Sequence, residues 1–102
     1  MPKSKFSVLV YPLAEEDLND ILDYLSELSP TIANSFLEKL SLNIEKLETF
    51  PEIHSLVIDK RLRDKGYRFI TIDNYLVFYV IVDTTVQVRR ILFGRRNYLA
   101  IL

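Results

Sequence analysis

The side chains of this sequence that could do chemistry are arginines placed among apolar and aromatic residues near the C-terminus, in GYRFITIDNYLVFYVIVDTTVQVRRILFGRRNY at residues 66–98. Such apolar density is typical of strands in the middle of a sheet. Arginine keeps its charge at any working pH, and its burial without a partner costs free energy. Arginines in these strands therefore predict a surface that contacts an anionic group. The leading candidates close the stretch: Arg95, Arg96 and Tyr98.

Length and composition indicate a single domain, residues 1–102, of ordinary size for one hydrophobic core. The chain contains no cysteine, so it has no disulfide, thiolate metal site or cysteine nucleophile. Its apolar runs are too short for a membrane-spanning helix, and its first residues lack the pattern of a signal peptide. We therefore expect a cytoplasmic protein that needs no cofactor or metal and does not contact a membrane.

Charge is distributed unevenly along the chain, although the formal net charge is only −1. Residues 1–59 contain four basic and eleven acidic side chains, whereas residues 60–102 contain nine basic and three acidic ones. This split predicts a basic patch that binds a partner. Alternatively, acidic helices neutralise a basic sheet. Arg89 and Arg90 are neighbours on a predicted strand and should point to opposite faces, so one of them could pair with a helix carboxylate.

Hydrophobic periodicity predicts the elements that position these arginines. Residues 6–11, 67–72, 75–82 and 86–93 are the β-branched and aromatic runs typical of strands. Asp73-Asn74 fits a two-residue hairpin turn, and a three-residue turn is expected at residues 83–85.

Two helices are predicted between the first and second strands. The first starts near Ala14, and the second runs from a cap at Ser29-Pro30 to just before Pro51. Residues 51–60 look like a loop, and residues 97–102 form either a helical turn or a short strand. The expected fold class is α+β, in the order β-α-α-β-β-β, with a helical hairpin packed on a small antiparallel sheet.

The predicted strand at residues 75–82 is apolar at every position, whereas a strand with one wet face should alternate. The helices can cover only one face of the sheet. The C-terminal tail, a second copy or a partner chain must cover the other face, and we expect a partner chain.

Several segments share a recognisable order and spacing. The first predicted helix contains Ala14-Glu15-Glu16-Asp17-Leu18 and continues through Ile21 to Tyr24, and the second runs from Ala33 through Phe36 to Leu47 and Pro51. The later segments are Leu62-Arg63, Gly66-Tyr67-Arg68, Asn74-Tyr75, Val77-Phe78-Tyr79 and Arg90-Ile91-Leu92-Phe93-Gly94-Arg95-Arg96. Over nearly the whole chain, this pattern resembles the RelE/ParE superfamily of toxins from type II toxin–antitoxin systems.

The resemblance implies a small growth-arresting toxin of an addiction or plasmid-stabilisation module, held inactive by a cognate antitoxin encoded beside it. The antitoxin typically wraps an extended and helical segment over the toxin, and contact with operator DNA would occur only through the antitoxin. Two activities divide the superfamily. RelE-like members cleave mRNA on the ribosome without a metal, whereas ParE-like members inhibit DNA gyrase.

Metal-free cleavage of RNA requires a base, a proton donor for the leaving oxygen and a cation on the phosphate. If the chain is a nuclease, the resemblance implies that Arg68, Arg96 and Tyr98 are its catalytic residues. The base is missing, however. Three residues replace the basic residues or histidine of RelE-like members: Ile70, Leu76 and Phe93.

We therefore expect ParE-like inhibition of DNA gyrase. A sequence pI near 5.8 agrees with this, because proteins that work inside ribosomal RNA are usually strongly basic. Two alternatives stay open, a RelE-like ribosome-dependent mRNA endonuclease and a decayed toxin that serves only as its antitoxin's partner. The residues expected to bind the target or the antitoxin are Arg63, Arg68, Tyr79, Arg90, Arg95, Arg96 and Tyr98.

Overall fold

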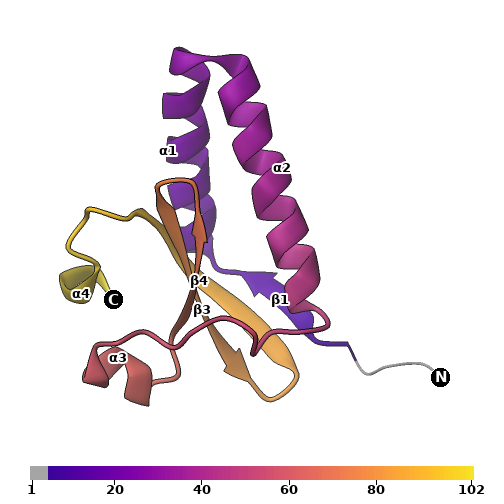
Figure 1. The fold of residues 1–102 in the computed structure, drawn as a ribbon, viewed down its shortest axis with the longest axis vertical. Coiled ribbons are helices and arrows are strands. Elements are labelled where there is room, and N and C mark those ends of the chain that lie inside the picture. The colour runs from indigo at the N-terminus through magenta and orange to yellow at the C-terminus, as the bar shows by residue number, and fades with distance from the viewer. Residues whose placement is uncertain (1–4) are drawn as a thin grey trace.

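The computed structural model describes residues 5–102 as a helical hairpin that covers one face of a four-stranded sheet (Figure 1). The elements along the chain are β1 Ser7–Val10, α1 Pro12–Leu28, α2 Pro30–Leu47, α3 Lys60–Asp64, β2 Arg68–Ile72, β3 Tyr75–Val82, β4 Thr85–Phe93 and α4 Tyr98–Ile101. The expected α+β fold class and the order of its main elements are confirmed. The helix α3 was not expected, and the C-terminal residues form the helical alternative.

The sheet is mixed, with strand order β1-β4-β3-β2. The strands β2, β3 and β4 are antiparallel neighbours, but β1 lies parallel to β4, with Ser7 opposite Thr85 and Val10 opposite Val88. The prediction of an antiparallel sheet was therefore wrong for its first strand. A parallel neighbour is possible because the long helical crossover between β1 and the rest of the sheet allows the chain to return in the same direction.

The two long helices bury one apolar stripe each against the sheet. Ser29 joins them, and its side chain accepts a hydrogen bond from the Thr31 amide at 3.2 Å, with Pro30 at the first position of α2. This is the cap that the sequence predicted. The buried residues of this helix-side core include Ala14, Ile21, Leu25, Phe36, Leu40, Val77, Tyr79, Val88 and Ile91.

Each of the two hairpin turns contains two residues and begins with an aspartate in the left-handed region. Asp73 has φ 53° and Asp83 has φ 54°. Aspartate tolerates this backbone conformation better than most residues. The turn at Asp73-Asn74 is confirmed, whereas the second turn is one residue shorter than expected because Thr85 already belongs to β4.

The second face of the sheet is covered by the chain itself. Phe78, Val80 and Leu92 are buried there beneath residues of the 57–67 segment and the C-terminal tail. We expected a partner chain to cover this face, and that prediction was wrong. The 57–67 segment and the C-terminal tail cover it instead. The segment is held by α3, whose Leu62 is fully buried and whose cap, Asp59, accepts from the Leu62 amide at 3.0 Å.

Candidate partner-binding surface

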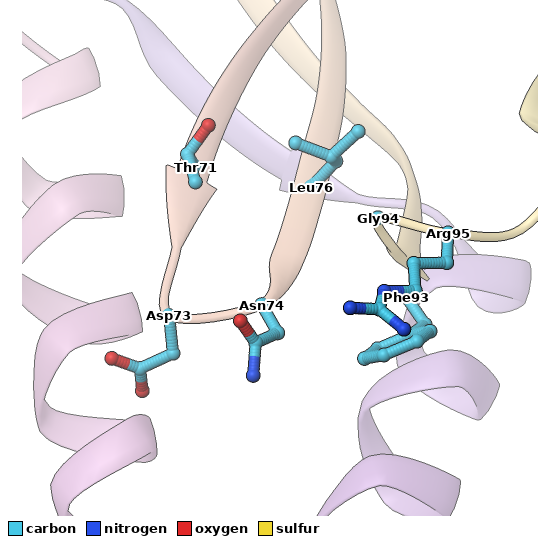
Figure 2. A pocket seen from close by; sticks show the side chains of 7 residues that line it. All are labelled: Thr71, Asp73, Asn74, Leu76, Phe93, Gly94 and Arg95. Atoms are coloured by element: carbon cyan, nitrogen blue, oxygen red, sulfur yellow. The ribbon is translucent and has the colours of Figure 1, made fainter.

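The end of β4 passes close to the turn between β2 and β3. The Gly94 amide donates a hydrogen bond to the Asn74 carbonyl at 2.8 Å, and a Cβ at position 94 would lie only 3.2 Å from that oxygen. A glycine therefore allows this approach. The resulting cavity has a volume of about 270 Å³. Figure 2 shows Arg95 beside Phe93 among the residues that line it, and the others are Thr71, Asp73, Asn74, Leu76 and Gly94.

An apolar groove of about 380 Å³ adjoins this cavity, because both contain Asp73, Asn74 and Phe93. Its helical wall carries side chains that remain exposed, namely Tyr24, Leu28 and Ile32. Together the two hollows form a surface that is apolar along the helical hairpin and cationic at Arg95. Exposed apolar surface bordered by charge is typical of a protein-binding site.

The predicted cluster at the C-terminus is only partly assembled. Arg95 and Arg96 are both exposed. Tyr98 turns back onto the second face of the sheet, where its ring lies 5.0 Å from that of Phe78. The tail is fastened further by Arg61, whose Nη2 donates to the Leu99 carbonyl at 2.6 Å.

Arg68 lies on the other face of the sheet. It is opposite Tyr79 in the pairing of β2 with β3, and Tyr79 belongs to the helix-side core. The Arg68 guanidinium donates to two carbonyls of the loop after α2, at 3.2 Å to Glu52 and 2.7 Å to His54. The sheet therefore separates Arg68 from Tyr98, and the predicted nuclease set of Arg68, Arg96 and Tyr98 is not brought together.

His54, the single histidine of the chain, is half-buried against Tyr79, with ring centroids 6.3 Å apart. Its Nε2 is buried and has no hydrogen-bond partner among residues 5–102. Burial, followed by the positive charges of Lys46 and Arg68, lowers the pKa of His54. His54 therefore lies in the loop after α2, against Tyr79 near the start of β2, whereas Arg95 follows β4 and lies beside the Asp73-Asn74 turn at the end of β2.

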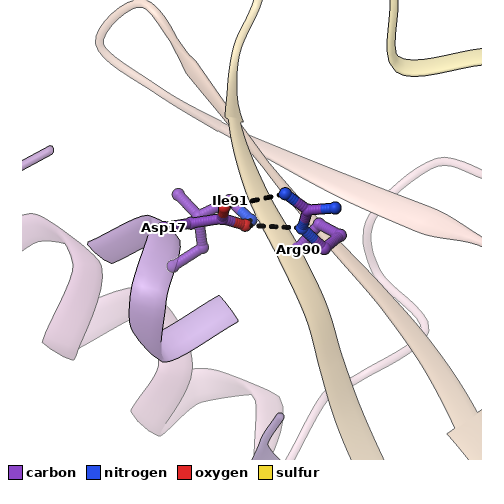
Figure 3. A network of polar contacts seen from close by, with 3 residues as sticks. All are labelled: Asp17, Arg90 and Ile91. Carbon is purple, nitrogen blue, oxygen red and sulfur yellow. Dashed lines mark hydrogen bonds and ion pairs between the residues drawn. The ribbon is translucent and has the colours of Figure 1, made fainter. Parts of the chain in front are cut away.

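Arg90 is held by a helix carboxylate, which confirms the pairing interpretation of the charge pattern for this residue. Its Nε and Nη2 donate to the two oxygens of Asp17 at 2.8 and 2.9 Å, and the Ile91 amide donates to the same carboxylate at 2.9 Å (Figure 3). The hydrogen bond to Asp17 is the main reason that the pKa of Arg90 is raised. Arg63, by contrast, is exposed on α3.

A β-bulge overturns the expectation that Arg89 and Arg90 point to opposite faces. Phe78 pairs with Arg90 and Tyr79 pairs with Val88, so Arg89 is the extra residue of β4. Both arginines line one small pocket as a result. Sequence reasoning missed Arg89 as a site residue, because strict alternation leaves no place for an inserted residue.

Tyr79 was expected to bind a partner, but its side chain is not accessible to one. Its side chain is fully buried, and its hydroxyl donates to the Pro51 carbonyl at 2.6 Å. The loop after α2 is thus fixed to β3 by an internal contact, which leaves nothing of this side chain for a partner.

The buried hydroxyl of Tyr79 makes the free energy of unfolding depend on pH in the alkaline range. Burial raises the pKa of Tyr79 to about 12, against a smaller opposing effect of the Arg68 charge. Below the ordinary tyrosine pKa of about 10 the stabilisation is fully present, and it is lost as the pH rises towards 12, because the unfolded chain ionises first. Between pH ~9 and ~12, wild-type unfolding free energy should therefore fall about 2 kcal/mol further than that of Tyr79→Phe. Urea titrations of both proteins measure the difference, and equal losses would contradict the prediction.

Within residues 5–102, no helix is long and apolar enough to cross a membrane. The same residues contain no group of three or more histidine, cysteine or acidic side chains that could hold a metal ion.

Comparison with known proteins places this geometry in context. A sequence model of the family described as "ParE toxin of type II toxin-antitoxin system, parDE" matches residues 8–98. Among solved structures, the chain is similar to one from "Chromosomal ParDE TA system from P. aeruginosa", with a TM-score of 0.71 and 17% identity over 89% of this chain and 98% of that one. It is also similar to a chain of the toxin–antitoxin complex RelBE2 from Mycobacterium tuberculosis, with a TM-score of 0.58 and 21% identity over 87% of this chain and 98% of that one. At these identities the structural likenesses show the fold, and no curated protein sequence matches the chain.

Proposed function

Because the chain belongs to the ParE toxin family of type II toxin–antitoxin systems, we propose that it arrests growth by binding DNA gyrase and does not cleave RNA. Its cognate antitoxin would neutralise it by covering part of the same surface. The chain would then act by binding alone, with the exposed arginines that follow β4 in contact with an acidic surface of the target.

The observation that carries this proposal is the separation of the candidate nuclease residues. Arg68 bonds the loop after α2 on the helix side of the sheet, whereas Tyr98 packs on Phe78 on the other side. Cleavage of a phosphodiester needs its acid, base and cation within hydrogen-bond reach of one phosphate. A target that binds through shape and charge needs no such convergence.

The cavity and groove beside Phe93 support a protein partner. The helical wall offers exposed apolar side chains of Tyr24, Leu28 and Ile32, and Arg95 supplies charge at one end. A combination of large apolar residues and arginine is typical of energetically important interface positions.

The deciding experiment adds the purified chain to two parallel assays, DNA supercoiling by gyrase and cell-free translation with mapping of mRNA ends. We expect supercoiling to stop while ribosome-bound mRNA stays intact. An Arg95→Ala/Arg96→Ala double variant should inhibit gyrase about ten-fold more weakly, as loss of interface arginines does.

Lys65→Ala serves as the charge control, because Lys65 is an exposed cation at the end of α3. Its inhibition should match that of the wild type. If translation stopped and mRNA were cut while supercoiling continued, the RelE-like alternative would replace the gyrase proposal. A chain that stopped neither process would indicate the decayed-toxin alternative.

A further inference from the structure

Arg89 is a half-buried arginine whose place is created by the bulge in β4. Its guanidinium carbon lies 4.8 Å above the ring centre of Tyr11, the residue before α1. Its Nε and Nη2 donate to the Gln87 Oε1 at 3.1 and 2.7 Å, and its Nη1 reaches the Tyr67 hydroxyl at 3.5 Å. The side chain is therefore fixed in direction by three neighbours.

All of these neighbours are uncharged. Within residues 5–102, no carboxylate forms an ion pair with Arg89, whereas Arg90 beside it is held by both oxygens of Asp17. An arginine carries five N–H donors, and the contacts of Arg89 with Gln87 and Tyr67 use three of them, so two hydrogens on the Nη nitrogens are left over. Arginine donors of this kind bind the oxygens of a carboxylate.

The guanidinium borders a pocket of about 170 Å³ with mostly apolar walls. Leu13, at the start of α1, is largely exposed on one side, and Ile101 and Leu102 of the C-terminal tail form the other side. A pocket of this size holds one apolar side chain beside the charged group.

The charges near the pocket decide what kind of anion can enter. Glu15 and Glu16 follow Leu13 and Ala14 in the first turns of α1, and Asp17 comes next but is paired with Arg90. A nucleic acid carries a phosphate at every nucleotide and would be repelled by this acidic turn. A peptide with a single carboxylate between apolar residues brings only one charge near this turn, so it is repelled less than a polyanion, and its apolar residues fit the apolar walls.

We propose that this pocket binds an aspartate or glutamate side chain of the antitoxin, with an adjacent apolar residue against Leu13 and the tail. This inference rests on the proposed role of an antitoxin as the partner. The bound carboxylate would accept hydrogen bonds from the remaining donors of Arg89. The adjacent apolar residue would pack against the C-terminal tail that follows Arg95 and Arg96. Neutralisation would then act on the C-terminal segment where it lies beside the start of α1.

The test measures binding of the antitoxin, taken as the product of the short reading frame next to that of the toxin, by calorimetry. Arg89→Met keeps the length of the side chain and removes its charge, and we expect at least a ten-fold loss of affinity. Arg89→Lys should restore only part of it, since an ammonium lacks the planar set of donors by which arginine binds a carboxylate. Lys65→Met, with the same change in net charge outside the pocket, should bind like the wild type.

A second variant leaves Arg89 and its contacts with Tyr11, Tyr67 and Gln87 in place. Leu13→Asp places a carboxylate at the rim of the pocket, in the first turn of α1 where an acid is favourable, and should weaken binding by occupying Arg89. Leu13→Asn is its uncharged control and should bind more tightly than Leu13→Asp.

Replacing each acidic residue of the antitoxin in turn by its amide identifies the carboxylate that binds Arg89. One of these replacements should lower the affinity for the wild-type toxin but should not lower the affinity for Arg89→Met any further, because two residues in direct contact show such coupling. Wild-type affinity in both Arg89→Met and Leu13→Asp would overturn the inference while leaving the antitoxin proposal intact. A wild-type chain that binds no antitoxin would instead overturn the proposed partner. A defect of Arg89→Met confined to binding of a labelled RNA or DNA oligonucleotide would assign the pocket to phosphate and also overturn the inference.

Discussion

Replacement of Asp17 by alanine is expected to lower the free energy of unfolding by about 2–4 kcal/mol, because it leaves a half-buried guanidinium without its counter-charge. Asp17 and Arg90 have side-chain exposures of only 12% and 20%, so water cannot fully replace the lost contact. The backbone amide of Ile91 loses its acceptor as well. Thermal unfolding of the purified chain should shift down by roughly 10–25 °C.

Asp17→Asn separates the two parts of this effect. The asparagine oxygen can still accept from the Ile91 amide, but the charge opposite Arg90 is gone, so this variant should fall between the wild type and Asp17→Ala. The surface pair of Lys39 and Asp73 is the matched control, with its atoms 2.7 Å apart and both side chains about half exposed. Lys39→Ala should cost at most about 1 kcal/mol. A similar cost for Asp17→Ala would show that the pair between α1 and β4 contributes little.

The parts of the fold that could be predicted from the sequence are those that depend on neighbouring residues in the chain. Local periodicity and turn residues were sufficient for both long helices, the Ser29 cap and the Asp73-Asn74 turn, because these depend on neighbours in the chain. The parallel pairing of β1 with β4 and the bulge at Arg89 depend on registers between segments far apart in sequence. Neither leaves a local signal. The helix α3 has only five residues, and its cap at Asp59 is a sequence sign that could have revealed it.

The candidate site was predicted to a similar extent. Arg95 and Arg96 are exposed, as a binding role requires. The phenylalanine at position 93, where the family resemblance implies a histidine in RelE-like nucleases, could be read directly from the sequence. The faces on which Arg68 and Tyr98 lie were not visible, because the tail reverses direction after β4 and folds back over the sheet. Arg90 and Tyr79 carried the right residue types for binding, but their bonds to Asp17 and Pro51 are internal.

Phe78→Ala is expected to destabilise the isolated chain by about 3–5 kcal/mol, as loss of a buried aromatic does. Phe78 is only 1% exposed and lies on the sheet face away from the helical hairpin, beneath Leu62, Tyr67 and the ring of Tyr98. Phe36→Ala, in the helix-side core, should cost a similar amount. Chemical denaturation of the purified chain without any partner measures both.

Two further variants make the comparison decisive. Ile58→Ala removes a side chain that is 87% exposed and should change stability by no more than about 0.5 kcal/mol. Tyr98→Ala combined with Phe78→Ala should cost less than the sum of the single changes, because the two rings share one contact. If Phe78→Ala were nearly neutral in the isolated chain, the second face would depend on a partner for its burial. A large cost means that the toxin folds with both sheet faces already covered, so an antitoxin binds a finished surface and need not complete the core.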